Sequence, residues 1–346
     1  MSAIATKLRV LLIGCGNIAG GFDADAAPGA PPRTHASAYL RHVGFSLEAC
    51  VEPDAAKRTA FVRRWGIARA YANIGEALAA GAGFDVISIC SPTTAHHDDG
   101  VAALSLRPRL LFCEKPVCDS LTQAEDLVRR CAAQGVLLAV NHNRRWDPEV
   151  VRLRGELASG RWGALRSVSG HYNKGVLNNG SHMIDLLHDL IGPLEPRHAG
   201  VPLYDYWPDD PTVPALLRAH GGVEVSLSAG HAADYSLFEL QFVTERAMIA
   251  MEDGGMRWRR RLAAPSPQFA GYRALPEGEF GPGGYLDTMS NAVANIHDAL
   301  RGGAALASDG ESALAAQRLC ERLRAMSLKS ASSASPGTPG HFQATE

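Results

Sequence analysis

Short, almost wholly apolar runs recur along the first part of the chain and limit its fold more than any other feature of the sequence. The runs are LRVLLIG, FSLEACVEPD, FDVISICSP, RLLFCEKP and VLLAVNHN, and helix-like patterns such as SLTQAEDLVRRCAAQG lie between them. Strands without polar alternation are covered on both faces, and strands that alternate with helices form parallel sheets. Residues 1–146 are therefore predicted to form a doubly wound α/β domain.

The pattern changes after Asp147. Segments such as LRSVSGHY, VEVSLSAGH and SLFELQFVTERAMIAMED alternate apolar and polar residues, and Gly- and Pro-rich turns join them. This period of two indicates a mostly antiparallel sheet with one covered face, so residues 147–328 are predicted to form an α+β domain. A last helix is expected to end near Ser327, and residues 329–346, which lack a core-forming pattern, are expected to be a disordered tail.

Composition excludes several classes of protein. A hydrophobic content of 46%, a charged content of 20% and a formal net charge of -2 describe an ordinary globular chain, with no sign of a nucleic-acid or membrane partner. The seven cysteines lie mostly inside apolar runs and form no C-x-x-C pair, so no metal site is predicted. The N-terminal segment before the first strand is too short for a signal peptide, which favours a cytoplasmic location.

A glycine turn after the first strand predicts a dinucleotide site. Gly14, Gly16 and Ala19 have the G-x-G-x-x-A spacing, so that backbone N–H groups here and at Asn17 and Ile18 can approach a pyrophosphate at a helix N-terminus. Glu52 ends the next strand, where a carboxylate binds ribose hydroxyls and repels a 2′-phosphate; NAD is therefore favoured over NADP. The alternative is a plain strand-turn-helix unit without a nucleotide.

A loop-like insert, residues 22–39, lengthens the connection between the glycine turn and Glu52. Its Arg33 and His35 are expected to lie over the cofactor or the site.

Two further strands end in polar residues. Because the carboxyl ends of parallel strands form the binding crevice, the residues expected to line it are Ser91, Pro92, His96, Glu114, Lys115 and Pro116. Lys115 can hydrogen-bond a substrate hydroxyl and stabilise the oxyanion that develops as hydride leaves carbon. The alternative is an ordinary ion pair between Glu114 and Lys115 on a loop.

The stretch VLNNGSHMIDLLHDL places Asn178, His182, Asp185 and Asp189 on one stripe of a helix. Taken alone, such a stripe is the wet side of an amphipathic helix. The other interpretation is that His182 transfers a proton, with Asp185 either bonded to it or capping local structure.

Substrate contacts are expected after two more strands. The residues are Asn143, Arg144, Arg145, Tyr172 and Lys174. The basic groups among them would suit a phosphate, a carboxylate or a nucleotide-diphosphate group, and the alternative is a set of interdomain salt bridges.

These motifs follow the order found in the Gfo/Idh/MocA oxidoreductases, which the chain resembles from about Arg9 to Ser327. They are the glycine turn, SPTTAH, EKP, NHNRRWDP and GSHMIDLL, of which EKP combined with the later G-x-H-x-x-D is the specific part. The resemblance implies an N-terminal Rossmann domain, a C-terminal domain with an open, mostly antiparallel sheet, and NAD(P)-dependent oxidation or reduction of a sugar, polyol or sugar nucleotide. It also implies a homodimer or homotetramer.

The resemblance assigns catalytic roles to Lys115 and His182, with His182 taking the hydroxyl proton. The family often has an aspartate one helical turn before this histidine, where the chain has Asn178. An amide can orient a hydroxyl but cannot accept a proton, so proton transfer rests on the other two residues. Two other functions stay open: glycoside hydrolysis through transient oxidation, and a dinucleotide-dependent sensor or scaffold without catalysis.

Overall fold

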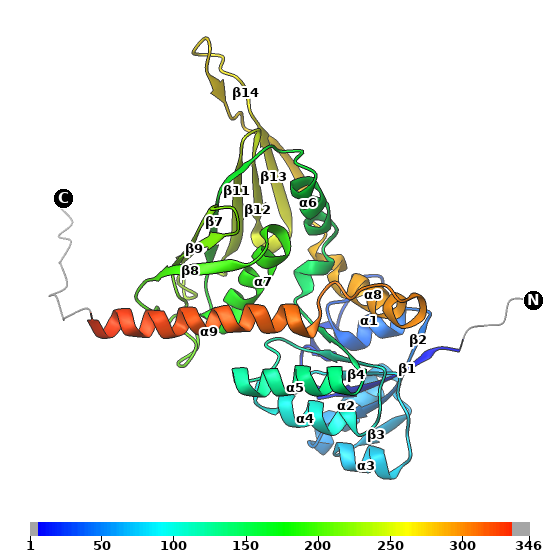
Figure 1. Ribbon diagram of the computed structural model, residues 1–346. Helices are drawn as coiled ribbons and strands as arrows, with labels where there is room; N and C mark the ends of the chain where they lie inside the picture. Colours follow the sequence, from blue (N-terminus) through cyan, green and yellow to red (C-terminus); the bar gives the residue numbers. More distant parts are fainter. Residues whose placement is uncertain (1–5, 334–346) are drawn as a thin grey trace, which may run out of the picture.

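The computed structural model describes residues 6–333, which form two large sheets with helices packed on them and one small two-stranded sheet (Figure 1). The first sheet has six parallel strands in the order β3-β2-β1-β4-β5-β6. The strands are β1 (Leu8–Ile13), β2 (Phe45–Val51), β3 (Arg69–Tyr71), β4 (Val86–Ile89), β5 (Leu110–Cys113) and β6 (Leu137–Val140). The strand order reverses between β1 and β4, which is where a doubly wound sheet binds its ligand. The predicted Rossmann fold is confirmed.

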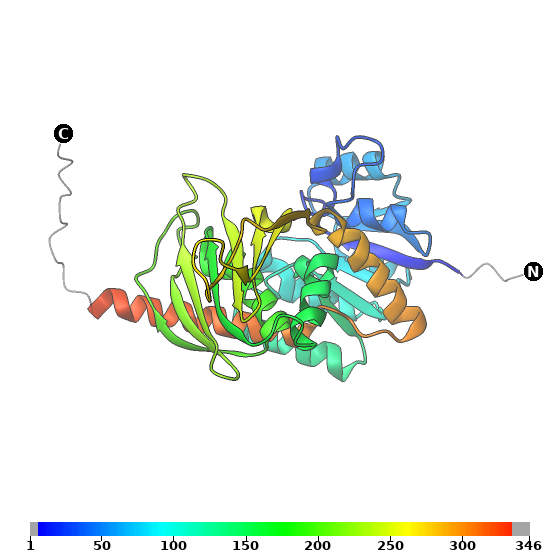
Figure 2. The same cartoon turned by 90° about the horizontal axis from the view of Figure 1, so that it is seen from above.

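Helices cover both faces of this sheet. One core contains apolar side chains of α1 (His35–Arg41), α2 (Ala55–Trp65) and α8 (Thr288–Gly302). The core on the other face contains those of α3 (Ile74–Ala79), α4 (His96–Leu104) and α5 (Leu121–Ala133). Since α8 comes from the far end of the chain, the C-terminal part returns to complete the first domain (Figure 2).

The second sheet has eight strands in the order β16-β13-β12-β11-β7-β10-β9-β8. Its strands are β7 (Leu165–Tyr172), β8 (Leu194–Ala199), β9 (Ala215–Ala219), β10 (Glu224–Ala229), β11 (Phe238–Thr244), β12 (Ala247–Glu252), β13 (Arg257–Leu262) and β16 (Glu279–Pro282). Within residues 6–333, β10 and β7 are the only neighbours in this sheet that pair in parallel, which confirms the mostly antiparallel prediction. Between β13 and β16, the short strands β14 (Ala264–Pro265) and β15 (Arg273–Ala274) form an arm that projects from the molecule (Figure 1).

Helices α6 (Pro148–Ala158) and α7 (Gly180–Ile191) pack on one face of the second sheet. Short helical turns join the larger elements: η1 (Gly21–Asp23), η2 (Thr93–Ala95), η3 (Asn143–Trp146), η4 (Gly175–Asn179), η5 (Asp253–Gly255) and η6 (Tyr285–Asp287). The turn η4 is π-helical and leads directly into α7.

The last helix, α9 (Gly310–Ser333), crosses both domains (Figure 1). Leu314, near its start, belongs to the core of the first domain, whereas Leu319 and Leu323 belong to the core of the second. The helix runs beyond the predicted end near Ser327, because the Ser330 hydroxyl donates to the carbonyl of Ala199 in β8 and holds the last turns on the sheet. Of the predicted tail, residues 334–346 lie outside the described part of the chain. Within residues 6–333, every helix is too short or too polar to cross a membrane.

The glycine turn departs from the prediction, because no α-helix follows it directly. One irregular turn forms instead, in which the N–H groups of Gly20 and Gly21 both donate to the carbonyl of Gly16, and η1 follows. Two adjacent glycines have low helix propensity, which accounts for the early stop. The helix α1 begins only at His35, inside the segment predicted to be a loop, after Thr34 caps it.

Candidate active site

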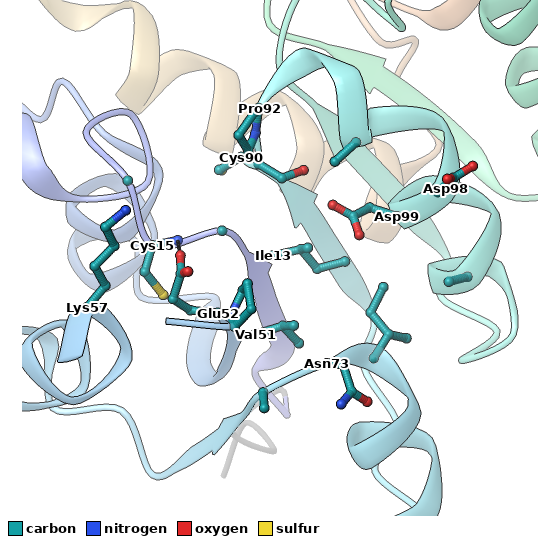
Figure 3. A pocket seen from close by; sticks show the side chains of 18 of the residues that line it. Ile13, Cys15, Val51, Glu52, Lys57, Asn73, Cys90, Pro92, Asp98 and Asp99 are labelled. Atoms are coloured by element: carbon teal, nitrogen blue, oxygen red, sulfur yellow. Dashed lines mark hydrogen bonds between the residues drawn. The ribbon is translucent and has the colours of Figure 1, made fainter. Parts of the chain in front are cut away.

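A cavity of about 900 Å³ lies at the carboxyl end of the parallel sheet, and we call it the Glu52 cavity (Figure 3). Gly14 turns the chain with a φ of +87°, and a Cβ there would lie 2.7 Å from the backbone nitrogen of Ser91. Only glycine fits this position. The Glu52 carboxylate accepts hydrogen bonds from the N–H groups of Cys15 at 3.0 Å and Asp54 at 3.1 Å. These bonds fix an acidic group beside the glycine turn.

Most of the predicted cofactor residues line this cavity. They are Gly14, Gly16, Asn17, Ile18, Glu52, Ser91 and Pro92. Gly16 is open, with no atom within 4 Å of a Cβ placed on it, so its backbone is accessible to a ligand. Four predicted residues do not line the cavity: Ala19, His96, Glu114 and Lys115. Ala19 is buried in the core, and the His96 ring faces the carbonyls of Ser91 and Pro116, so it joins two loops.

The loop after β5 is held by Glu114. Its carboxylate accepts hydrogen bonds from Asn141 at 2.7 Å and lies 2.9 Å from the His35 ring nitrogen. Burial opposes ionisation of Glu114, but the interactions with His35 and Asn141 outweigh it and hold the pKa below its ordinary value. His35 of the insert is fully buried and supports the Glu114 loop from inside, so the prediction that it lies over the cofactor or the site is wrong. Glu114 itself is a positioning group that does not line the Glu52 cavity.

Lys115 and Asn178 join the two domains. The Lys115 Nζ donates to the Asn178 Oδ1 at 2.6 Å and to its carbonyl at 3.2 Å. Burial lowers the pKa of Lys115 from 10.5 to about 8. The ammonium therefore keeps its proton at neutral pH but is poised to lose it a little above.

His182 lies close to the same group, on the first turn of α7. Its ring meets the His142 ring edge to face at 5.4 Å. Burial, together with the charges of Lys115 and Arg144, holds the pKa of His182 well below its ordinary value. The imidazole is therefore neutral at physiological pH, in the form that accepts a proton. The stripe of α7 thus faces the first domain, and the wet-side interpretation does not describe it.

Arg145 and Asp185 are not available to a substrate in the way predicted. The Arg145 guanidinium donates to the Asp185 carboxylate at 2.8 Å and to Asp189 at 3.4 Å. Both members of the first pair are buried. The alternative interpretation, an interdomain salt bridge, describes them, because a buried cation needs carboxylates to replace its lost hydration.

The other four predicted substrate residues lie in four different places. Tyr172 is 0% exposed and its hydroxyl donates to the Val213 carbonyl, so it is a core residue and no substrate contact. Arg144 stacks 3.7 Å from the Phe238 ring centroid and donates to a backbone carbonyl. Asn143 lines a separate cavity of about 440 Å³, beside Arg33 of the insert. Lys174 has a left-handed backbone with a φ of +66° and precedes η4.

A third cavity, of about 510 Å³, contains Lys115 and Asn178 in its wall, and we call it the Lys115 cavity. Three of its lining residues come from parts of the chain without a recognisable motif: Trp207, Asp210 and Arg324. Their segment between β8 and β9 reads as a turn-rich loop, and Arg324 as the polar side of a helix. No periodicity or spacing in the sequence singles them out.

Comparison with known proteins finds a family and relatives that are similar to this chain. Residues 8–142 match the family model GFO_IDH_MocA, described as an oxidoreductase family with an NAD-binding Rossmann fold. The inositol 2-dehydrogenase of Rhizobium meliloti (strain 1021) is 24% identical over 267 residues, which cover 71% of this chain and 79% of the relative.

Two solved structures show the likeness of fold. The WlbA dehydrogenase from Bordetella pertussis, in complex with NADH and UDP-GlcNAcA, has a TM-score of 0.76 at 18% identity and covers 94% of this chain and 96% of its own. A 3-ketoreductase from Actinomadura kijaniata, in complex with TDP-benzene and NADP, has a TM-score of 0.72 at 18% identity. The match covers 93% of this chain and 98% of the ketoreductase.

Proposed function

The chain belongs to the Gfo/Idh/MocA oxidoreductases, and from this premise we propose that it transfers hydride between NAD and a carbon that bears a hydroxyl or ketone in a sugar or polyol. The observation that carries the proposal is the approach of two groups from different domains: the Lys115 ammonium bonds to Asn178, four residues before His182, and its charge helps to lower the pKa of His182. The names of the relatives support the same class: besides the inositol dehydrogenase, they include a D-glucoside 3-dehydrogenase of Escherichia coli.

The residues present fit a dinucleotide. The glycine turn offers an open backbone at Gly16, and the strand that ends at Glu52 places a carboxylate in the same cavity. Because the Glu52 carboxylate would repel a 2′-phosphate, we propose NAD as the preferred cofactor. When bound, the nicotinamide supplies the hydride acceptor or donor.

The protein's own residues would accept the hydroxyl proton and stabilise the oxygen that loses it. His182, neutral because of burial and the neighbouring cations, accepts the proton of the substrate hydroxyl. The protonated Lys115 donates a hydrogen bond to the same oxygen and stabilises its developing negative charge. Asn178 orients the Lys115 ammonium by accepting a hydrogen bond at its Oδ1, and its amide takes no proton itself.

The first test is a titration with NADH and NADPH, followed by energy transfer from tryptophan to the bound nicotinamide. We expect at least a tenfold preference for NADH, and Glu52→Gln should reduce it. Equal binding of both would contradict the role of Glu52, and binding of neither would overturn the oxidoreductase proposal. With a substrate in hand, full turnover by both Lys115→Met and His182→Ala would disprove the assigned chemistry.

Product analysis separates this function from glycoside hydrolysis through transient oxidation, which releases sugar without net NADH.

The family resemblance also leads us to propose a homodimer or homotetramer. The outer face of the second sheet carries the exposed Leu216 and Phe280, at 49% and 51% exposure, as candidate contacts. Light scattering coupled to size exclusion measures the assembly directly, and a monomer at micromolar concentration would contradict it.

A further inference from the structure

The loop between β8 and β9, residues 200–214, is bonded at two points to η4 and to Lys174, the residue before it. The Asp205 carboxylate accepts hydrogen bonds from the N–H of Lys174 at 2.9 Å and from the hydroxyl of Thr212 at 2.7 Å. Farther along, the Asp210 carboxylate accepts hydrogen bonds from the N–H groups of Leu177 and Asn178, both at 2.9 Å. The middle of the loop is therefore fixed relative to Asn178.

Trp207 lies in this fixed middle and lines the Lys115 cavity. Its indole is 46% exposed, although so large an apolar ring gains most from burial. The Tyr206 ring packs edge to face against it at 4.9 Å, and the Lys174 ammonium lies 5.5 Å from the Tyr206 ring centroid. An aromatic face is thus held open at the wall that also contains Lys115 and Asn178.

The charges of the Lys115 cavity are unfavourable to a strongly anionic ligand. Three carboxylates line it, from Asp119, Asp209 and Asp210, against the two cations Lys115 and Arg324. Both cations already have partners. The Lys115 ammonium bonds to Asn178, and the Arg324 guanidinium donates to the Asp209 carbonyl at 2.7 Å and lies 3.8 Å from Glu321.

Carboxylates are good acceptors for sugar hydroxyls, and an indole face packs well on the C–H face of a pyranose. A diphosphate, by contrast, would meet like charges in this cavity. The volume of about 510 Å³ lies within the range of about 300–1,000 Å³ that small-molecule sites occupy.

We propose that the Lys115 cavity binds an uncharged glycoside, with the reacting ring at Lys115 and Asn178 and the second ring or aglycone stacked on Trp207. Sugar nucleotides are then poor substrates. This inference rests on the proposed function, because it takes Lys115 as the group at the reacting carbon.

Calorimetry on the NADH-loaded protein tests the inference without requiring turnover. The probes are the phenyl β-D-pyranosides of glucose, galactose, mannose and xylose, the four free sugars, and the UDP derivatives of glucose and galactose. At least one phenyl glycoside should bind tenfold more tightly than its free sugar and than either UDP-sugar. Trp207→Ala should reduce the ratio of glycoside to free-sugar affinity by about 3- to 10-fold.

Tyr204→Ala is the matched control, since this ring is 53% exposed on the same loop but does not line the cavity. It should leave the ratio unchanged. Three results would each overturn the inference. They are a UDP-sugar as the tightest ligand, no binding of any glycoside, or a ratio of glycoside to free-sugar affinity that Trp207→Ala leaves unchanged. Turnover of the same panel with NAD decides the proposed function separately, so glycoside binding without hydride transfer would contradict that function alone.

Discussion

Asn178→Asp should shift the alkaline fall of the pH–rate profile to higher pH. The Asn178 Oδ1 lies 2.6 Å from the Lys115 Nζ, so the substitution places a carboxylate in contact with the ammonium. An opposite charge at this distance favours the protonated form and raises its pKa by about 1–3 units. The pKa of Lys115, which burial lowers to about 8, would then lie between about 9 and 11.

The assay is kcat/KM for oxidation, measured from pH 6 to 11 with saturating NAD. In the native protein, the rate should fall above about pH 8, because Lys115 loses the proton with which it stabilises the substrate oxygen. In Asn178→Asp, the same fall should come about 1–3 units higher. Asn179→Asp adds the same charge one residue away and should shift the fall by less than about half a unit. A fall that stays in place in Asn178→Asp, or that moves equally in both variants, would refute the role of Lys115 as a protonated donor.

Two further predictions concern stability. Because burial lowers the pKa of Lys115 from 10.5 to about 8, the folded protein holds this proton less tightly than the unfolded chain, which destabilises it below pH 8. Lys115→Met should therefore raise the free energy of unfolding at pH 7 by about 1–3 kcal/mol, and this gain should vanish by pH 10.5. Urea unfolding at both pH values measures the gain. A gain that does not depend on pH would show that the lowered pKa of Lys115 is not its cause. Arg145→Met should cost about 3–5 kcal/mol in the same assay, because it leaves Asp185 buried without its cation. Adding Asp185→Asn should recover most of that loss, and equal instability of the single and double variants would show that the ion pair is not the reason.

The sequence predicts the first domain well for a physical reason. Its strands are covered on both faces, so their apolar runs are continuous and easily read, and the strand ends then locate Glu52 and Lys115. The glycine turn was harder to interpret. Its spacing predicts a helix, but the pair Gly20 and Gly21 stops one after a single turn.

The sequence could not predict which polar residues meet across the domains. Arg145 and Lys115 both follow buried strands, yet one forms a buried ion pair and the other faces a cavity. The difference depends on which residues of α7 and η4 lie opposite, and that is set by tertiary packing. Trp207 and Asp210 were missed for the same reason, since the loop between the edge strand β8 and its neighbour β9 carries no periodicity.

The route of α8 and α9 has a consequence for biosynthesis. The two helices are made after both sheets, yet side chains such as Ile296 and Leu314 fill the two cores of the first domain. Until they are added, α1 to α5 already lie on the parallel sheet, but the part of each apolar core that α8 and α9 fill stays exposed. Nascent protein of this kind is expected to need a chaperone until α8 and α9 have been made, and a premature stop before α8 should yield an insoluble fragment instead of a free nucleotide-binding domain.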